Sequence, residues 1–365
     1  MADDIARAVA VSPDGSKVFV TGESPGADIL NQDFTTVAYD AATGTQLWTN
    51  RFNGSGNSHD EGYAISVSPD GSAVFATGFS TSLGLNVDYS TVAYDPATGK
   101  QLWRSAYSGP DEGSATAVAL AVSPGGSKVF VTGYVSGPTG WDYGTVAYEA
   151  STGAQLWDET YTSVGTGSDL ATAVAVSPGG ATVFVTGASA GANGEFDYAT
   201  VAHDASTGSR RWVRRYNGPG GLNDFPTSIA VAPGGSTVFV TGQSDGLTSG
   251  IDIATIAYDA ATGGPRWLRR FNGALNSSDF GRSIVVSPGG KKVFVTGLAD
   301  GNYVTLAYRA GTGSGVWLQY YDGPAQGSDG AYDVAVSPGG SKLYVTGTSN
   351  GSNGDSDWAT LAYAS

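Results

Sequence analysis

The sequence predicts an all-β protein built from seven repeated units of four strands, and two recurring motifs carry that prediction. The first motif follows the form A-x-D-x-x-T-G-x-x-x-W, as in Ala38–Trp48. Its tryptophans stand 55, 54, 55, 55 and 50 residues apart, at Trp48, Trp103, Trp157, Trp212, Trp267 and Trp317. A period of this size, sustained along the chain, indicates a repeat architecture.

The second motif is a tight turn between two apolar runs. Its second residue is Pro, which pre-sets φ, and its fourth is Gly, which accepts positive φ. The flanking Val, Ala, Phe and Thr residues are typical of β-strands. The seven copies begin at Ser12, Ser68, Ser123, Ser177, Ala232, Ser287 and Ser337.

Each unit is therefore predicted to contain four strands, A to D. In the first unit they lie near residues 8–11, 17–21, 35–39 and 45–51. Both faces of strands A to C are apolar or small, which indicates burial on both faces. Sheets packed face to face around an axis provide that burial, so the units are predicted to be blades of a seven-bladed β-propeller.

One period runs from end to end, which predicts a single domain over residues 1–365. We expect blades at about 4–54, 60–109, 113–162, 169–218, 224–273, 279–323 and 329–365. Strand D occurs only six times. The seventh blade has strands near 333–336, 342–346 and 360–363 and is predicted to lack its outer strand. Its open edge at 360–363 is then a template for contact with another chain, or for a segment upstream of the sequence.

The amino-acid composition limits the kinds of partner that the protein can be expected to bind. Lys plus Arg is 18 and Asp plus Glu is 33, a net charge of −15, which disfavours nucleic acid and anionic membranes. The absence of cysteine excludes disulfides, thiol nucleophiles and cysteine-ligated metals. No apolar run approaches the roughly 18 residues of a membrane span, so no membrane insertion is expected. A glycine-rich, lysine-poor monomer is expected. This composition favours a secreted or extracellular protein whose leader precedes the sequence, and leaves a cytoplasmic one open.

The residues quoted above resemble known propeller families over the whole chain. The eleven-residue unit ending in Trp resembles the tryptophan-docking motif of quinoprotein (PQQ) propellers, which implies that the tryptophans pack between blades. The run VSPDGSKVFVTG resembles the YVTN repeat, and the recurring DYxTVAY with YNGP resembles SBBP repeats. Quinoprotein enzymes with the motif are larger, typically eight-bladed, and often carry an adjacent cysteine pair, so we expect no PQQ here. No cofactor is assigned.

The candidate site lies at one end of the predicted propeller. The short A–B and C–D turns share one end, so the long variable connections share the other, the top face, where rigid scaffolds place function. Strand A is expected to line the channel. Near its top, neighbouring blades carry Arg7, Tyr63, Arg282, Tyr332 and Asp333. Arg and Tyr could hold a carboxylate or sugar at the channel mouth, or the arginines could neutralise nearby acids.

A second variable series follows the T-G of strand B and includes Glu23, Phe79 and Tyr134. Trp141 is expected in the third B–C loop. Exposed aromatic side chains there suit stacking on sugar or peptide, with packing of the loop as the alternative.

Two series of acids recur once per blade on the top face. One begins the C strands (Asp33, Asp88, Asp142, Asp197, Asp252 and Asp357), and the other precedes the A strands (Asp4, Asp60, Asp169, Asp224, Asp279 and Asp329). They are candidate ligands of a hard cation such as Ca²⁺, or caps that accept backbone N–H groups. His59, beside Glu61, could be an acid/base group or ligand, or be solvated. His203 is assigned no role.

These observations favour a binding or scaffold propeller that captures a small molecule, sugar or peptide at its top face. The alternative is an enzyme at the same channel mouth: a hydrolase, lyase or sugar-type dehydrogenase, with Ca²⁺ as a possible ion. The sequence contains no nucleophile elbow, zinc-protease motif or phosphate loop. No residue is therefore assigned as catalytic or as a metal ligand.

Overall fold

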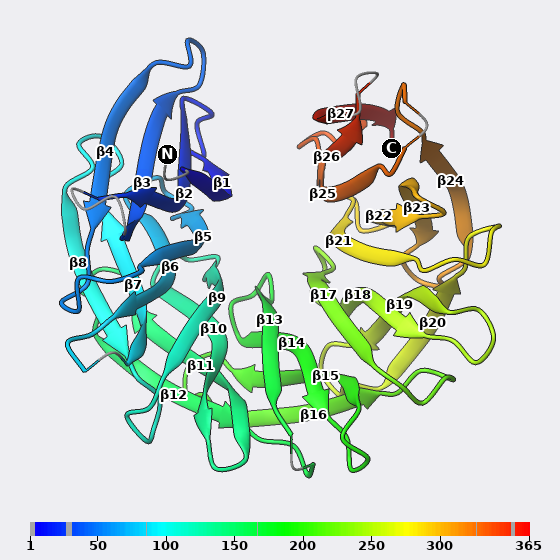
Figure 1. Ribbon diagram of the computed structural model, residues 1–365, viewed down its shortest axis with the longest axis horizontal. Coiled ribbons are helices and arrows are strands. Elements are labelled where there is room, and N and C mark those ends of the chain that lie inside the picture. Colours follow the sequence, from blue (N-terminus) through cyan, green and yellow to red (C-terminus); the bar gives the residue numbers. More distant parts are fainter. Residues whose placement is uncertain (1–3, 27–30, 85, 166, 326, 352–354) are drawn as a thin grey trace. The chain divides into compact units, whose positions relative to one another are not determined.

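The structure is a computed structural model that describes residues 4–26, 31–84, 86–165, 167–325, 327–351 and 355–365. The strands form six sheets of four consecutive antiparallel strands and a last sheet of three (Figure 1). The predicted fold class, an all-β seven-bladed propeller whose seventh blade has no outer strand, is confirmed.

The strand bounds are as follows. Blade 1 comprises β1 (Ile5–Val11), β2 (Lys17–Pro25), β3 (Gln32–Asp40) and β4 (Gln46–Phe52); blade 2, β5 (Glu61–Val67), β6 (Val74–Thr81), β7 (Val87–Tyr94) and β8 (Gln101–Tyr107); blade 3, β9 (Ala115–Val122), β10 (Lys128–Gly137), β11 (Gly140–Glu149) and β12 (Gln155–Tyr161); blade 4, β13 (Asp169–Val176), β14 (Thr182–Ala190), β15 (Phe196–Asp204) and β16 (Arg210–Tyr216). Blade 5 comprises β17 (Asp224–Val231), β18 (Thr237–Asp245), β19 (Ile251–Asp259) and β20 (Pro265–Phe271); blade 6, β21 (Phe280–Val286), β22 (Lys292–Ala299), β23 (Asn302–Arg309) and β24 (Gly315–Tyr321); blade 7, β25 (Gly330–Val336), β26 (Lys342–Asn350) and β27 (Ser356–Ala364).

The chain divides into two compact units. The first comprises Met1–Val176, Gly180–Val183 and His203–Ser209, and the second Ser177–Gly179, Phe184–Ala202 and Arg210–Ser365. Blades 1 to 3 lie in the first unit and blades 5 to 7 in the second. Within each unit, neighbouring blades pack through their first strands: β1 on β5 and β5 on β9 in the first, β17 on β21 and β21 on β25 in the second.

The turns follow the predicted chemistry, whereas the strands are longer than predicted. The fourth residue of every S/A-P-x-G turn has positive φ, for example 71° at Gly15, whose N–H donates to the Ser12 carbonyl at 2.8 Å. The inner strands continue past the predicted ends because the hairpins keep pairing toward the top: Pro25 still pairs with Gln32.

Five tryptophans are buried, as predicted. Trp48, Trp103, Trp157, Trp212 and Trp267 are 7–8% exposed. Each indole N–H donates to a backbone carbonyl of the next blade's C–D turn, with distances from 2.8 to 3.2 Å. Each ring also contacts a phenylalanine of its own blade and a tyrosine or histidine of the next blade. These contacts hold successive blades together.

Trp317 differs from the other five. It packs between Phe294 of blade 6 and Tyr363 of blade 7, yet it is only half-buried. Blade 7 ends with its third strand and so has no C–D turn to cover the ring.

Candidate functional site

A β-bulge recurs in the first strand of the blades, and it coincides with the variable series that contains Arg7. The register shifts between Ala6 and Ala8 in β1 and between Gly62 and Ala64 in β5, so Arg7 and Tyr63 are the extra, unpaired residues. Blades 3, 5, 6 and 7 shift at the equivalent place. A bulge re-aims its side chain away from the ladder. The scaffold therefore presents one variable side chain per blade at this position.

Blades 1 and 2 approach closely at the start of β5. A Cβ built on Gly62 would lie 2.6 Å from a ring carbon of Phe34 and would also overlap the Thr21 hydroxyl. Only a glycine permits this contact between β5 and the inner strands of blade 1. As a result, Glu61, the first residue of β5, comes beside Glu23 on β2.

Four charged or titratable side chains meet there. His59 Nε2 lies 2.7 Å from Glu23 Oε2 and 3.6 Å from Glu61 Oε2. On the other side, Arg7 donates from Nη2 to Glu23 Oε1 at 3.2 Å and from Nε to Glu61 Oε1. The carboxylate side chains are only 5% and 3% exposed, against 39% for Arg7 and 50% for His59. The two glutamates are thus buried between two half-exposed bases.

The electrostatics of this cluster follow from that arrangement. Burial opposes the charge on Arg7, but Glu61 and Glu23 more than offset it and raise the pKa of Arg7 above its ordinary value. Burial, together with the charge of Glu61 and a hydrogen bond to it, raises the pKa of the Tyr63 hydroxyl well above 10. Arg7 therefore stays cationic and Tyr63 stays a neutral donor over the whole physiological range.

Aromatic rings continue the cluster toward blade 3. Phe79 lies 5.3 Å from the His59 ring and 5.9 Å from the Tyr63 ring, centroid to centroid. In blade 3, Tyr134 and Trp141 form an edge-to-face pair at 5.2 Å. The prediction of a loop position for Trp141 is wrong. Because β10 and β11 extend to a tight hairpin, Trp141 is on β11, where it pairs with Ser136 and is half-buried.

The other predicted site residues lie in the second unit. The Arg282 guanidinium carbon is 5.6 Å from the Phe280 ring centre and 6.0 Å from that of Tyr332. Ser283 donates to Asp333 Oδ1 at 2.7 Å. Within the described ranges, Arg282 forms no ion pair, unlike Arg7, so its guanidinium remains available to an anion.

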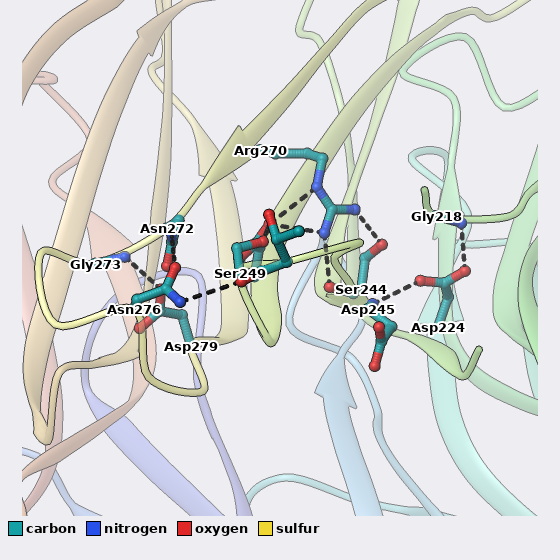
Figure 2. Close-up of polar contacts among 12 residues, drawn as sticks. Gly218, Asp224, Ser244, Asp245, Ser249, Arg270, Asn272, Gly273, Asn276 and Asp279 are labelled. Atoms are coloured by element: carbon teal, nitrogen blue, oxygen red, sulfur yellow. Dashed lines mark hydrogen bonds and ion pairs between the residues drawn. The ribbon is translucent and has the colours of Figure 1, made fainter. Parts of the chain in front are cut away.

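Four of the acids that precede the A strands are loop caps, which is the second of the two alternatives considered: Asp60, Asp224, Asp279 and Asp329. Asp60 accepts from the N–H groups of Gly54 at 2.6 Å and Thr81 at 2.8 Å. Figure 2 shows the same role for Asp224, on Gly218 and Asp245, and for Asp279 on Gly273. Asp329 caps Gly323 and Asn350 in the same way.

Two acids of the other series are held by arginines of the outer strand. Arg270 pairs with Asp252 at 2.8 Å and also donates to the Ser244 carbonyl, as Figure 2 shows in part. Arg215 pairs with Asp197 at 2.9 Å. These contacts engage Oδ2 of each carboxylate within its own blade.

Sequence reasoning weighed His59 and Glu61 but did not include them among the site residues. A position-by-position comparison of the repeats contains the signal. Glu61 pairs with Phe79, a member of the variable B-strand series. The equivalent residues of five other blades are uncharged: Ile5, Thr116, Phe225, Phe280 and Gly330. Glu23, in turn, stands where five of the other blades carry Phe79, Tyr134, Gln243, Leu298 and Thr348. Two acids break the pattern at adjacent sites of neighbouring blades.

Several proteins of known structure are similar to this chain. It is similar to hydrazine synthase of Kuenenia stuttgartiensis (14% identity, TM-score 0.64, 100% of this chain and 97% of that one). It is also similar to BamB of Moraxella catarrhalis (17%, 0.57, 99% and 84%) and to the β-propeller domain of Myceliophteria thermophila Cps50 (Swd1) (10%, 0.60, 100% and 98%). At these identities the likeness shows the fold alone. No curated protein sequence matches the chain.

The blades form a β-propeller, the fold that these solved structures share. A family model described as "Outer membrane protein assembly factor BamB" matches residues 4–255, more than half of the chain, and the chain belongs to this PQQ-like family. Within the described ranges there is no helix with the length and apolar character needed to cross a bilayer.

Proposed function

We propose that the protein is a binding propeller that captures a sugar at the cluster shared by blades 1 to 3. The observation that carries the proposal is the meeting of Arg7, Glu23, His59 and Glu61 beside the rings of Tyr63 and Phe79. Flat aromatic faces stack on sugar rings, and a few placed charged groups fix the orientation of hydroxyl groups. Tyr134 and Trp141 extend the aromatic surface in the same unit.

The test is a titration with defined oligosaccharides, both neutral (cello- and chito-oligomers) and acidic (oligogalacturonides), followed by calorimetry and thermal shift. Phe79→Ala and Trp141→Ala should weaken binding, whereas Trp358→Ala should leave it unchanged, because Trp358 is 92% exposed in the other unit. Binding of short peptides in place of sugars, with the same dependence on Phe79, would move the proposal to a peptide ligand. Oligosaccharide affinity that is unchanged in both Phe79→Ala and Trp141→Ala would refute the site.

Arg282, Tyr332 and Asp333, in the second unit, form a separate candidate contact surface. The uncompensated guanidinium of Arg282 over two aromatic rings suits a carboxylate-bearing ligand. Arg282→Ala should therefore weaken acidic oligosaccharides more than neutral ones. Equal effects on both classes would assign Arg282 a structural role.

An enzyme is the second candidate function, favoured by one observation. His59 bridges two buried carboxylates, an arrangement that can exchange a proton with a bound substrate. A hydrolase, a lyase or a sugar-type dehydrogenase at this cluster should lose turnover, with its ligand still bound, in His59→Gln. Binding lost in parallel with turnover would favour the binding function.

Export is also part of the proposal. The composition and the membership in a family described by an outer membrane assembly factor support an extracytoplasmic location. Fractionation of the source cells with an antibody to the protein tests this, and recovery in the cytosolic fraction would contradict it.

A further inference from the structure

We propose that Glu23, His59 and Glu61 bind one divalent transition-metal ion of the Zn²⁺ type. One carboxylate oxygen from each glutamate and one imidazole nitrogen lie within 4.8 Å of one another. Bonds of about 2.0–2.2 Å from zinc to N and O ligands place the ligand atoms of one ion about 3–4 Å apart. The separation of 3.6 Å from His59 Nε2 to Glu61 Oε2 lies within that range, and the 2.7 Å to Glu23 Oε2 is a few tenths of an ångström shorter. Small side-chain movements would admit the ion.

Arg7 does not contact the glutamate oxygens that face His59, which are the ones that would bind the metal. It takes Oε1 of both glutamates, whereas the Oε2 atoms of both face His59. A donor behind a ligating carboxylate fixes its orientation, as outer-shell partners of metal sites do.

The charge balance of the cluster also calls for a cation. Two buried carboxylates carry two negative charges, and Arg7 supplies one positive charge. A metal is bound by a neutral imidazole, so a metal-bound cluster would set the two carboxylates against the single positive charge of Arg7. A divalent ion on the face opposite Arg7 supplies the missing charge.

The donor set selects the kind of metal. An imidazole nitrogen with two carboxylate oxygens suits Zn²⁺ or its neighbours in the first transition row, whereas Ca²⁺ and Mg²⁺ prefer oxygen ligands throughout. Three protein ligands leave a fourth position open, the arrangement of sites that accept an outside ligand. His59 is half-exposed, so the ion can enter from solvent.

The blade itself does not need these side chains. The loop before β5 is held by the carboxylate of Asp60 and by the Thr81 hydroxyl, which donates to the His59 carbonyl at 2.7 Å. Blades 5 to 7 build the same loop with their own Asp caps and no acid at the Glu61 position. The cluster is therefore an addition to the scaffold, and the inference goes beyond the proposed sugar binding, which does not require a metal.

The experiment uses the full chain without an affinity tag, freed of metal with EDTA and dialysed at pH 7.5. Zn²⁺ is titrated by calorimetry, and Co²⁺ by its visible spectrum. We expect one saturable site with micromolar affinity or better, Co²⁺ bands of a low-coordinate N/O site, and no displacement by millimolar Ca²⁺ or Mg²⁺. His59→Gln and Glu61→Gln should each weaken Zn²⁺ by at least about 100-fold, more than the 10- to 100-fold typical of losing an outer-shell partner.

The second histidine provides the matched control. His203 is buried and stands where all six other blades carry a tyrosine, so His203→Tyr restores the repeat and should leave Zn²⁺ affinity unchanged. Absence of a saturable site in the wild type, or equal affinity in His59→Gln, overturns the proposal and leaves the cluster as an ion-pair network around Arg7. His59→Gln decides the matter even where a glutamate variant fails to fold. Oligosaccharide titrations run with and without EDTA keep failure of the metal site distinct from failure of the proposed function.

Discussion

The indole ring of Trp48 in blade 1 lies directly over the backbone of Gly99 in blade 2. A Cβ built on Gly99 would fall 2.5 Å from Trp48 Cδ2, and the indole N–H donates to the Pro96 carbonyl at 3.2 Å. The same relationship joins Trp103 to Gly153 and Trp267 to Gly313. The C–D turns of blades 2, 3 and 6 therefore need their glycines twice, for positive φ and for the space that the ring fills.

Gly99→Ala and Gly44→Ala separate those two needs. Both glycines have φ near 70°, which costs an L-residue about 1–2 kcal/mol, but only Gly99 lies under a tryptophan; nothing is within 4 Å of a Cβ on Gly44. We expect Gly99→Ala to be more destabilising than Gly44→Ala by about 1–3 kcal/mol, the usual cost of overpacking. Urea denaturation measures the difference, and equal losses would contradict the role of the ring.

Trp103→Ala should lower the free energy of unfolding by about 3–5 kcal/mol, as for other large buried aromatics. Its ring is 8% exposed and its N–H donates to the Ala150 carbonyl at 2.8 Å. Trp358→Ala is the control. With 92% of Trp358 exposed, the change should stay within about 0.5 kcal/mol. Similar effects at both positions would argue against burial between blades as the source of stability.

The aspartates of the two S-P-D-G turns should make stability sensitive to acid. Hydrogen bonds from the Ser12 hydroxyl and from the Ser16 N–H and hydroxyl lower the pKa of Asp14 to about 2, and equivalent bonds from Ser68 and Ser72 do the same for Asp70. Since the unfolded pKa is about 3.9, the folded state binds these protons more weakly. Their contribution is therefore complete above about pH 4 and is lost as pH falls toward 2.

Carboxyl NMR titration of Asp14 and Asp70 checks those pKa values directly. Stability measurements on the double variant Asp14→Gly, Asp70→Gly provide the second readout, since Gly occupies this place in the other five repeats. The wild type's advantage should shrink between about pH 4 and pH 2. An advantage that is constant with pH would show that the hydrogen bonds do not favour the ionised form.

Because one edge of β27 is unpaired, adding a strand there should stabilise the protein. In blade 6, β23 leads through a turn into β24, and Ser365 follows β27 as Ala310 follows β23. Fusing a copy of residues 311–321 after Ser365 should supply a fourth strand and raise the melting temperature by roughly 1 °C for each kcal/mol gained, because the entropy of unfolding grows with chain length. The same extension with Ser in place of the tryptophan should gain less. A crystal contact along 360–363 in the unextended chain would be the alternative use of the same edge.

The sequence by itself determined the repeat, the turns and the count of strands, because these depend on local chemistry. Pro and Gly set the φ angles of residues 12–15 wherever the motif recurs, and the spacing of tryptophans reports one blade after another. The missing outer strand of blade 7 followed from the same count. Capping of backbone N–H groups, a local role, was one of the two explanations for the acids that precede the A strands. The hydrogen bonds of Asp60 confirm it for that residue.

Only the tertiary structure decided what meets at the site. Glu23 and Glu61 belong to different blades, and they become neighbours because Gly62 lets β5 approach Thr21 and Phe34 of blade 1. The bulges that re-aim Arg7 and Tyr63 are also invisible in hydrophobic periodicity, since they change pairing and not composition. The spacing of the motifs puts Trp141 in the third B–C loop, whereas pairing across a two-residue hairpin extends the strand through it. Contacts between blades depend on packing distances, and no single repeat encodes them.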